Sequence, residues 1–137
     1  MIMGLAREVC VMPRTIHTDD APAAVGPYSQ ATTDGHVMCT AGQIALTPDG
    51  DDLTDRPLEE QTVQCLSNLE AVLAAEGLDF TDVLKTTIYL DDIDDYAAVN
   101  EIYAEYFTES PPARSAVAVD ALPKGAAVEI EVIASTR

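Results

Sequence analysis

Residues 111–119 read Pro-Pro-Ala-Arg-Ser-Ala-Val-Ala-Val, a double proline followed by an arginine at the start of a predicted β-strand. The chain has only 7 Lys+Arg against 24 Asp+Glu, and its formal net charge is -17. A guanidinium group binds a carboxylate through two parallel hydrogen bonds. We therefore predict that Arg114 binds the carboxylate of a small organic acid. The alternative is a structural ion pair with Glu129 or Glu131 across a subunit contact.

The segments around this strand predict one α+β domain. Predicted strands occupy residues 28–33, 37–44, 83–90, 113–120 and 127–135, and predicted helices occupy residues 57–76 and 93–107. This order, β-β-α-β-α-β-β, predicts a mixed sheet with both helices on one face. We assign residues 13–137 to the domain and residues 1–12 to an N-terminal extension outside it.

Local signals support several of these boundaries. Asp34-Gly35 is a turn dipeptide between the first two strands. Pro57 suits the start of the first helix, and Gly77 suits the position after its end. Apolar residues at helical spacing predict its buried stripe, which comprises Leu58, Cys65, Leu66, Leu69, Val72 and Leu73.

Side-chain alternation in the last two strands predicts which residues share a face. The bulky residues expected to face the helices are Val117, Val119, Val128, Ile130 and Val132. Arg114, Ala116, Glu129 and Glu131 would then point away from the helices. If the two strands form a hairpin, Ala116 lies roughly opposite Glu131. An oligomer would enclose this polar face as a pocket.

Composition excludes several classes of protein. The chain is 47% hydrophobic, but it has no apolar run near the roughly 20 residues of a membrane span. It also lacks a signal-peptide pattern, so we predict a cytoplasmic protein. Three cysteines argue against a disulfide framework, and Cys39 and Cys65 are predicted to fill the core. The two histidines have no second ligand at metal-binding spacing, so no metal site is predicted.

The acidic residues are spread along the whole chain. Such a surface stays hydrated in concentrated salt, where its self-repulsion is screened. We interpret it as an adaptation to a salty cytoplasm, with cation binding as the alternative. The same charge argues against binding to a phosphate backbone.

Six motifs occur in the order found in a known family. They are Ala-Pro-Ala-Ala-Val-Gly-Pro-Tyr-Ser-Gln-Ala at 21–31, Ala-Gly-Gln-Ile at 41–44, Lys-Thr-Thr-Ile-Tyr-Leu at 85–90, Val-Asn at 99–100, Pro-Ala-Arg-Ser at 112–115 and Val-Glu-Ile-Glu-Val-Ile-Ala at 128–134. From about residue 13 to the end, the chain resembles the Rid (RidA/YjgF) family of reactive-intermediate deaminases. The resemblance implies a chorismate-mutase-like fold, a homotrimer around a central barrel and sites between subunits.

The same resemblance implies an activity. Members of the family hydrolyse small enamine and imine carboxylates, such as 2-aminoacrylate and 2-iminopropanoate, to 2-keto acids and ammonia. It implies no cofactor and no metal. Substrate would be a small molecule, with no nucleic-acid or membrane partner.

Carried over by motif, the resemblance assigns roles to individual residues. Arg114 would bind the substrate carboxylate and Glu129 would position or activate water. The implied substrate-binding positions are Tyr28, Gly42, Asn100, Arg114 and Ala116. The family often has Ser at the position of Ala41 and Cys at that of Ala116, so substrate preference and rate are open.

The residue patterns leave simpler roles open. In these simpler roles, Glu129 is an acid exposed to water and Tyr28 is an aromatic residue that packs at the start of a strand. Asn100 then hydrogen-bonds locally on its helix, and Gly42 marks a bulge or close packing in its strand. We assign Tyr96, Tyr103 and Tyr106 to core and subunit packing. The competing function is a non-catalytic trimeric module that binds keto acids. A ribonuclease, an activity ascribed to some relatives, is disfavoured by the net charge.

Overall fold

The computed structural model describes residues 13–136. The predicted N-terminal extension, with Cys10, lies outside the described residues. The strands are β1 (Arg14–Ile16), β2 (Ala31–Thr33), β3 (Val37–Thr40), β4 (Val83–Leu90), β5 (Ala113–Ala118) and β6 (Val128–Ser135). The α-helices are α2 (Leu58–Ala74) and α3 (Tyr96–Tyr106), and short 3-10 turns span Phe80–Asp82, Ile93–Asp95 and Pro123–Gly125.

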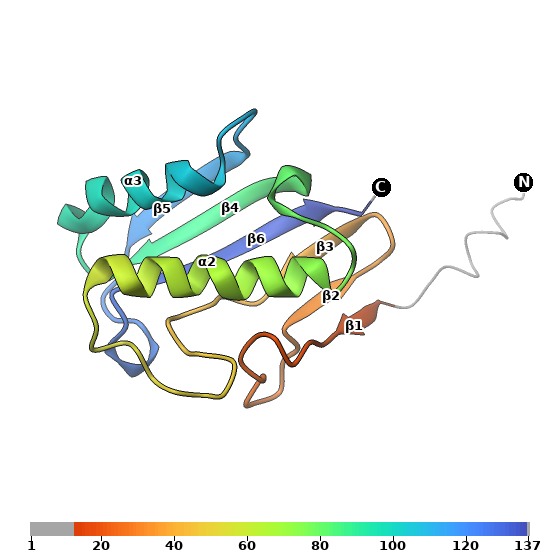
Figure 1. The fold of residues 1–137 in the computed structure, drawn as a ribbon, viewed down its shortest axis with the longest axis horizontal. Helices are drawn as coiled ribbons and strands as arrows, with labels where there is room; N and C mark the ends of the chain where they lie inside the picture. Colours follow the sequence, from red (N-terminus) through yellow and green to blue (C-terminus); the bar gives the residue numbers. More distant parts are fainter. Residues whose placement is uncertain (1–12, 137) are drawn as a thin grey trace, which may run out of the picture.

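The strands form one mixed sheet in the order β1-β2-β3-β6-β4-β5, and both helices cover the same face of it (Figure 1). The β4–β5 pair is parallel and every other neighbouring pair is antiparallel. This arrangement confirms the predicted α+β class with its two helices. The sequence did not predict β1, which has only three residues and is too short for alternation to reveal.

The core lies between the sheet and the two helices. The predicted stripe of the first helix is confirmed: its cysteine, leucines and valine from residue 65 to 73 are fully buried, and Leu58 is partly buried. Ile88, Leu90 and Ile130 meet these side chains from the sheet. Cys65 belongs to this core as predicted, but Cys39 is exposed, so its predicted core role is wrong. Within residues 13–136 no helix is both long and apolar enough to cross a membrane.

The predicted hairpin between the last two strands is wrong. β4 lies between them, so that Ala116 of β5 pairs with Ile88 and Glu131 of β6 pairs with Thr87. The central position suits β4 because its helix-side residues Thr86, Ile88 and Leu90 are almost completely buried. The chain after β5 is long enough to pass the end of one strand, since neighbouring strands lie only about 4.8 Å apart.

The predicted orientation of β5 is also wrong. Arg114 and Ala116 point toward the helices: Arg114 contacts α3, and Ala116 packs against the core. Val117 points the other way and is 45% exposed. β5 is an edge strand, and the face of α3 above it presents tyrosines that accommodate a guanidinium group. Because side chains alternate, this one-residue difference in orientation reverses the whole strand.

The orientation predicted for β6 is correct. Val128, Ile130 and Val132 are buried toward the helices. Glu129 and Glu131 therefore point to the helix-free face, where they pair with Tyr89 and Thr87 of β4. Arg114 and Glu129 thus lie on opposite faces of the sheet of one chain.

Candidate functional site

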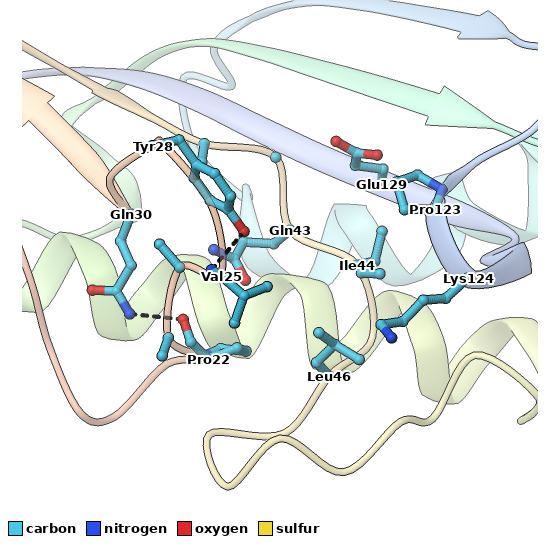
Figure 2. A pocket seen from close by; sticks show the side chains of 14 residues that line it. Pro22, Val25, Tyr28, Gln30, Gln43, Ile44, Leu46, Pro123, Lys124 and Glu129 are labelled. Atoms are coloured by element: carbon cyan, nitrogen blue, oxygen red, sulfur yellow. Dashed lines mark hydrogen bonds between the residues drawn. The ribbon is translucent and has the colours of Figure 1, made fainter.

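A cavity of about 410 Å³ lies beside the start of β6, where several loops meet. Figure 2 shows Tyr28 and Glu129 in its upper part and Leu46 below. The walls are formed by Pro22, Ala23, Ala24, Val25, Tyr28, Gln30, Ala41, Gly42, Gln43, Ile44, Leu46, Pro123, Lys124 and Glu129. The cavity therefore brings together three of the predicted site residues, Tyr28, Gly42 and Glu129.

Gly42 lies directly against the carboxyl group of Glu129. A Cβ at position 42 would overlap Glu129 Oε2 and would lie 2.8 Å from Glu129 Cδ. The backbone is held there by the adjacent Gln43, whose N–H donates to Ile130 O at 2.8 Å and whose O accepts from Ile130 N–H at 3.1 Å. The strand-like bridge therefore fixes Gly42 next to Glu129, and only glycine leaves room for the carboxylate.

The surroundings of Glu129 disfavour its charged form. Partial burial, and next the negative charge of Glu131, raise the pKa of Glu129 above the ordinary glutamate value. No ion pair in residues 13–136 involves Glu129. A partly buried carboxyl group with a raised pKa is suited to exchanging a proton with a bound molecule.

The loop before β2 forms one wall of the cavity and is held by a buried glutamine. Gln30 Nε2 donates to the backbone oxygens of Pro22 at 2.8 Å, Thr18 at 3.0 Å and Ala21 at 3.3 Å. Tyr28 Oη accepts from Val25 N–H at 3.4 Å. Figure 2 draws this bond and the bond from Gln30 to Pro22. These bonds keep Tyr28, which is 54% exposed, at the rim of the cavity.

Arg114 lies in a second cluster, on the helix-covered face at the sheet edge. Its guanidinium carbon is 4.8 Å from the ring centre of Tyr103 and 5.4 Å from that of Tyr96. Arg114 Nη2 donates to Tyr96 Oη at 2.8 Å. The arginines that form ion pairs within residues 13–136 are Arg14 and Arg56, so the described part of the chain leaves Arg114 without a carboxylate partner.

Asn100 belongs to this second cluster. Its side chain hydrogen-bonds Tyr96, and this bond, together with the nearby Arg114, lowers the pKa of Tyr96. Asn100 Oδ1 is buried and has no hydrogen-bond partner within residues 13–136. Ala116 follows Arg114 on the same face of β5, against the core.

One chain therefore carries two separate groups of predicted site residues. Tyr28, Gly42 and Glu129 line the cavity, whereas Arg114, Asn100 and Ala116 lie across the sheet. Within a single chain these groups do not form one site.

Tyr96, Tyr103 and Lys124 were not predicted from the sequence as candidate site residues. The tyrosines lie seven positions apart, which places them on one face of a helix, but only the parallel pairing of β4 and β5 shows that this face covers Arg114. Lys124 adopts a left-handed backbone with φ 58° and extends along the cavity wall toward Leu46 (Figure 2). Lys124 lies between two predicted strands, and the residues around it in the sequence do not indicate a cavity.

Residues 18–136 match the family model described as Endoribonuclease L-PSP. The human 2-iminobutanoate/2-iminopropanoate deaminase is 46% identical over 121 residues, which cover 88% of each chain. A Rid-family protein of unknown function from Yersinia pestis superposes with a TM-score of 0.87 at 47% identity, covering 90% of this chain and 99% of that one. The YjgF gene product of E. coli superposes with a TM-score of 0.85 at 42% identity, covering 90% and 99%.

The fold and the matched length place the chain in a class of small α+β proteins that includes deaminases. The chain belongs to the YjgF/Rid family, whose model carries the L-PSP description. The resemblance predicted from the six motifs is therefore confirmed.

Proposed function

We propose that this protein hydrolyses small 2-imino and 2-enamino carboxylates to 2-keto acids and ammonia. One observation carries the proposal: in a chain with 24 acidic residues, Arg114 has no carboxylate partner within residues 13–136 and is held on two tyrosine rings. A structural arginine in so acidic a protein is expected to form an ion pair. An arginine kept free is available to a ligand carboxylate.

The complete site would be formed by two copies of the chain. Arg114 and Glu129 point to opposite faces of one sheet, so a small substrate cannot touch both within one subunit. The helix-free face also exposes Val117 and Ile133, by 45% and 38%, and apolar side chains on an open sheet face support contact with another copy. A cyclic trimer, as the family resemblance implies, would supply Arg114 to the cavity of a neighbour.

In this site Arg114 would hold the carboxylate and Glu129 would handle protons. Water oxygen adds to the carbon of the protonated imine, and Glu129 accepts the proton that the water loses. The neutral Glu129 then returns this proton to the amino group, the C–N bond breaks, and ammonia leaves. The species that remains is the 2-keto acid protonated on its carbonyl oxygen, and loss of this proton gives the 2-keto acid. A raised pKa makes Glu129 a better proton acceptor than an ordinary carboxylate.

A keto-acid-binding module is the second candidate. Ala41 lines the cavity without a hydroxyl group, and Ala116 adds no polar atom beside Arg114. A site that keeps its carboxylate anchor but has few further polar groups is able to bind product without turnover. Turnover separates the two candidates.

The description of the family as endoribonucleases does not fit this chain's charge. The net charge is -17, and two of the arginines in residues 13–136 are paired with acids. Nuclease substrates carry a dense phosphate charge that acidic surfaces repel. The comparison with the human deaminase favours a small-molecule substrate instead.

The test is the hydrolysis of 2-iminopropanoate, generated by an amino-acid oxidase acting on alanine, with semicarbazide as the competing trap. The wild type should lower semicarbazone formation and Arg114→Ala should not. Arg56→Ala, which removes a surface arginine paired with Glu60, is the matched control and should act as the wild type. Light scattering must show the same oligomeric state for all three proteins.

Two results would count against the deaminase. If Arg114→Ala is as active as the wild type, Arg114 does not bind the substrate. If the wild type is inactive but binds 2-oxobutanoate, the keto-acid-binding module replaces the enzyme.

A further inference from the structure

The hydroxyl group of Tyr96 lies beside two donor-bearing side chains. It accepts a hydrogen bond from Arg114 Nη2 at 2.8 Å. The neighbouring side chain of Asn100 lowers the pKa of Tyr96, and Asn100 Oδ1 is buried without a hydrogen-bond partner within residues 13–136. A phenol oxygen that accepts a hydrogen bond still has its own proton to donate.

That proton has no acceptor within residues 13–136. The group bonded to Tyr96 Oη, Arg114 Nη2, is a donor, and Asn100 Oδ1, an acceptor on the same helix, makes no hydrogen bond within the described residues. The Tyr96 proton is therefore available to a ligand.

We propose that the Tyr96 hydroxyl donates a hydrogen bond to the same substrate carboxylate that Arg114 binds, which makes Tyr96 a second anchor of the substrate. This inference rests on the proposed function, because it takes the ligand of Arg114 to be a carboxylate. An ionised carboxylate has about four acceptor positions. It can accept two bonds from the guanidinium and a third from the phenol.

Exposure distinguishes Tyr96 from its neighbour Tyr103. Tyr96 is 39% exposed, whereas Tyr103 is 6% exposed and its hydroxyl bonds Thr86 Oγ1 at 2.8 Å. A ligand can therefore reach the hydroxyl of Tyr96 but not that of Tyr103. Tyr103 supports the guanidinium with its ring.

The charges around Tyr96 also favour donation. The Asn100 amide, and next the Arg114 guanidinium, lower the pKa of Tyr96 below that of an ordinary tyrosine. A more acidic hydroxyl is a stronger hydrogen-bond donor to an anion. The groups that face Tyr96 are Arg114 from β5 and Asn100 from its own helix.

The test compares Tyr96→Phe, Tyr106→Phe and Arg114→Ala with the wild type. Tyr96→Phe keeps the ring under the guanidinium and removes only the hydroxyl. Tyr106→Phe removes a hydroxyl from the same helix, at a position that packs on Phe80. Binding of 2-oxobutanoate is measured by calorimetry and turnover by the semicarbazide assay.

We expect Tyr96→Phe to raise the Kd for 2-oxobutanoate roughly tenfold, as for a lost hydrogen bond to a charged group. KM should rise by a similar factor while kcat changes by less than about twofold, because the carboxylate is held equally before and during the reaction. Tyr106→Phe should match the wild type. Arg114→Ala should lose measurable binding.

A pH series separates direct contact from mere support of Arg114. As pH rises through the lowered pKa of Tyr96, the hydroxyl loses its proton and the phenolate repels the ligand, so wild-type affinity should fall. Tyr96→Phe should lack this alkaline loss. If Tyr96→Phe weakens binding but keeps the wild-type pH profile, Tyr96 only positions Arg114 and the proposal is wrong.

The remaining outcomes separate this proposal from the one on which it rests. Wild-type affinity in Tyr96→Phe, with binding lost in Arg114→Ala, would overturn the role of Tyr96 alone. Wild-type affinity in both variants would overturn the carboxylate site at Arg114 as well.

Discussion

Gly42 has no side chain at the one place where the carboxyl group of Glu129 occupies the space of a Cβ. The contact involves the end of a flexible side chain, and Gly42 does not have a left-handed backbone. An added methyl group can therefore be accommodated by moving the carboxylate. The absence of a side chain at Gly42 therefore allows the Glu129 carboxyl group to lie where it does.

We predict that Gly42→Ala displaces the Glu129 carboxylate and lowers deaminase activity by at least about tenfold, a typical contribution of a positioned acid–base group being about 100-fold or more. The free energy of unfolding should change by less than about 1 kcal/mol, because no cavity or buried unpaired group is created. Urea denaturation and the semicarbazide assay measure the two effects. The double variant Gly42→Ala/Glu129→Gln should be no less active than Glu129→Gln; a further large loss would show that Gly42 acts otherwise.

The raised pKa of Glu129 gives a second prediction at this scale. Burial, and next Glu131, raise this pKa, so the folded chain binds the proton more tightly than the unfolded chain. The associated stabilisation is complete below the ordinary glutamate pKa and is lost as pH rises through the raised pKa. Glu129→Gln should therefore have a higher Tm than the wild type near neutral pH, and the difference should vanish at about pH 4.

Thermal unfolding followed by circular dichroism across this pH range measures the effect. Glu109→Gln, at an exposed position, removes the same charge without the burial and is the matched control. A gain in Tm that is equal for both variants would attribute the effect to net charge alone.

Helix α2 positions the cavity through polar side chains on its buried face. Asn68 Nδ2 donates to Leu46 O at 2.9 Å and to Ile44 O at 3.4 Å, and both of these residues line the cavity. Gln61 Oε1 accepts from Ala127 N–H at 3.0 Å, just before β6 begins. The helix thus holds two loops that ordinary strand pairing does not.

We predict that Asn68→Ala lowers the free energy of unfolding by about 1–3 kcal/mol, because it leaves the part-buried Leu46 O without its side-chain donor. The loop from residue 41 to 46 should lose amide protection in hydrogen exchange, and KM should rise. Ser67→Ala, on the exposed side of the same helix, should change neither. Unaltered exchange in Asn68→Ala would show that the loop is held by its own contacts.

At the scale of the whole molecule, we predict that the helix-free face of the sheet contacts another copy of the chain. Val117 and Ile133 on this face are 45% and 38% exposed, and the two halves of the proposed site lie on opposite faces of the sheet. Contact between copies would cover the apolar residues and complete the site together. The net charge of -17 per chain opposes such contact unless salt screens it.

We predict that Val117→Glu dissociates the assembly and abolishes deaminase activity, because a charge at a covered position is costly. Light scattering in about 1 M potassium chloride should give three times the mass of one chain for the wild type and a single-chain mass for the variant. Val63→Glu, at an exposed position of α2, should assemble normally. A monomeric, fully active wild type would refute the shared site.

Local patterns in the sequence were enough to predict the α+β class, both α-helices and every strand of the described residues except β1. The apolar stripe from Leu58 to Leu73 lies on one helix face, and the alternation of β6 separates Val128 and Ile130 from Glu129, because both patterns follow from the periodicity of the backbone itself. The motifs around Tyr28, Gly42 and Glu129 likewise identified residues that line one cavity.

The order of strands and the face of β5 were decided only by the tertiary structure. Arg114 and Val117 lie on opposite faces of β5, and alternation alone does not show which of these faces points toward the helices. Nothing near them in the sequence shows which face α3 covers. The parallel pairing of β5 with β4 places the Arg114 side under Tyr96 and Tyr103, where a guanidinium finds aromatic rings and a hydroxyl. Contacts between residues far apart in the chain have no local signature. The sequence alone therefore determined which residues carry groups able to bind a carboxylate or exchange a proton, and the tertiary structure decided which of these residues lie together.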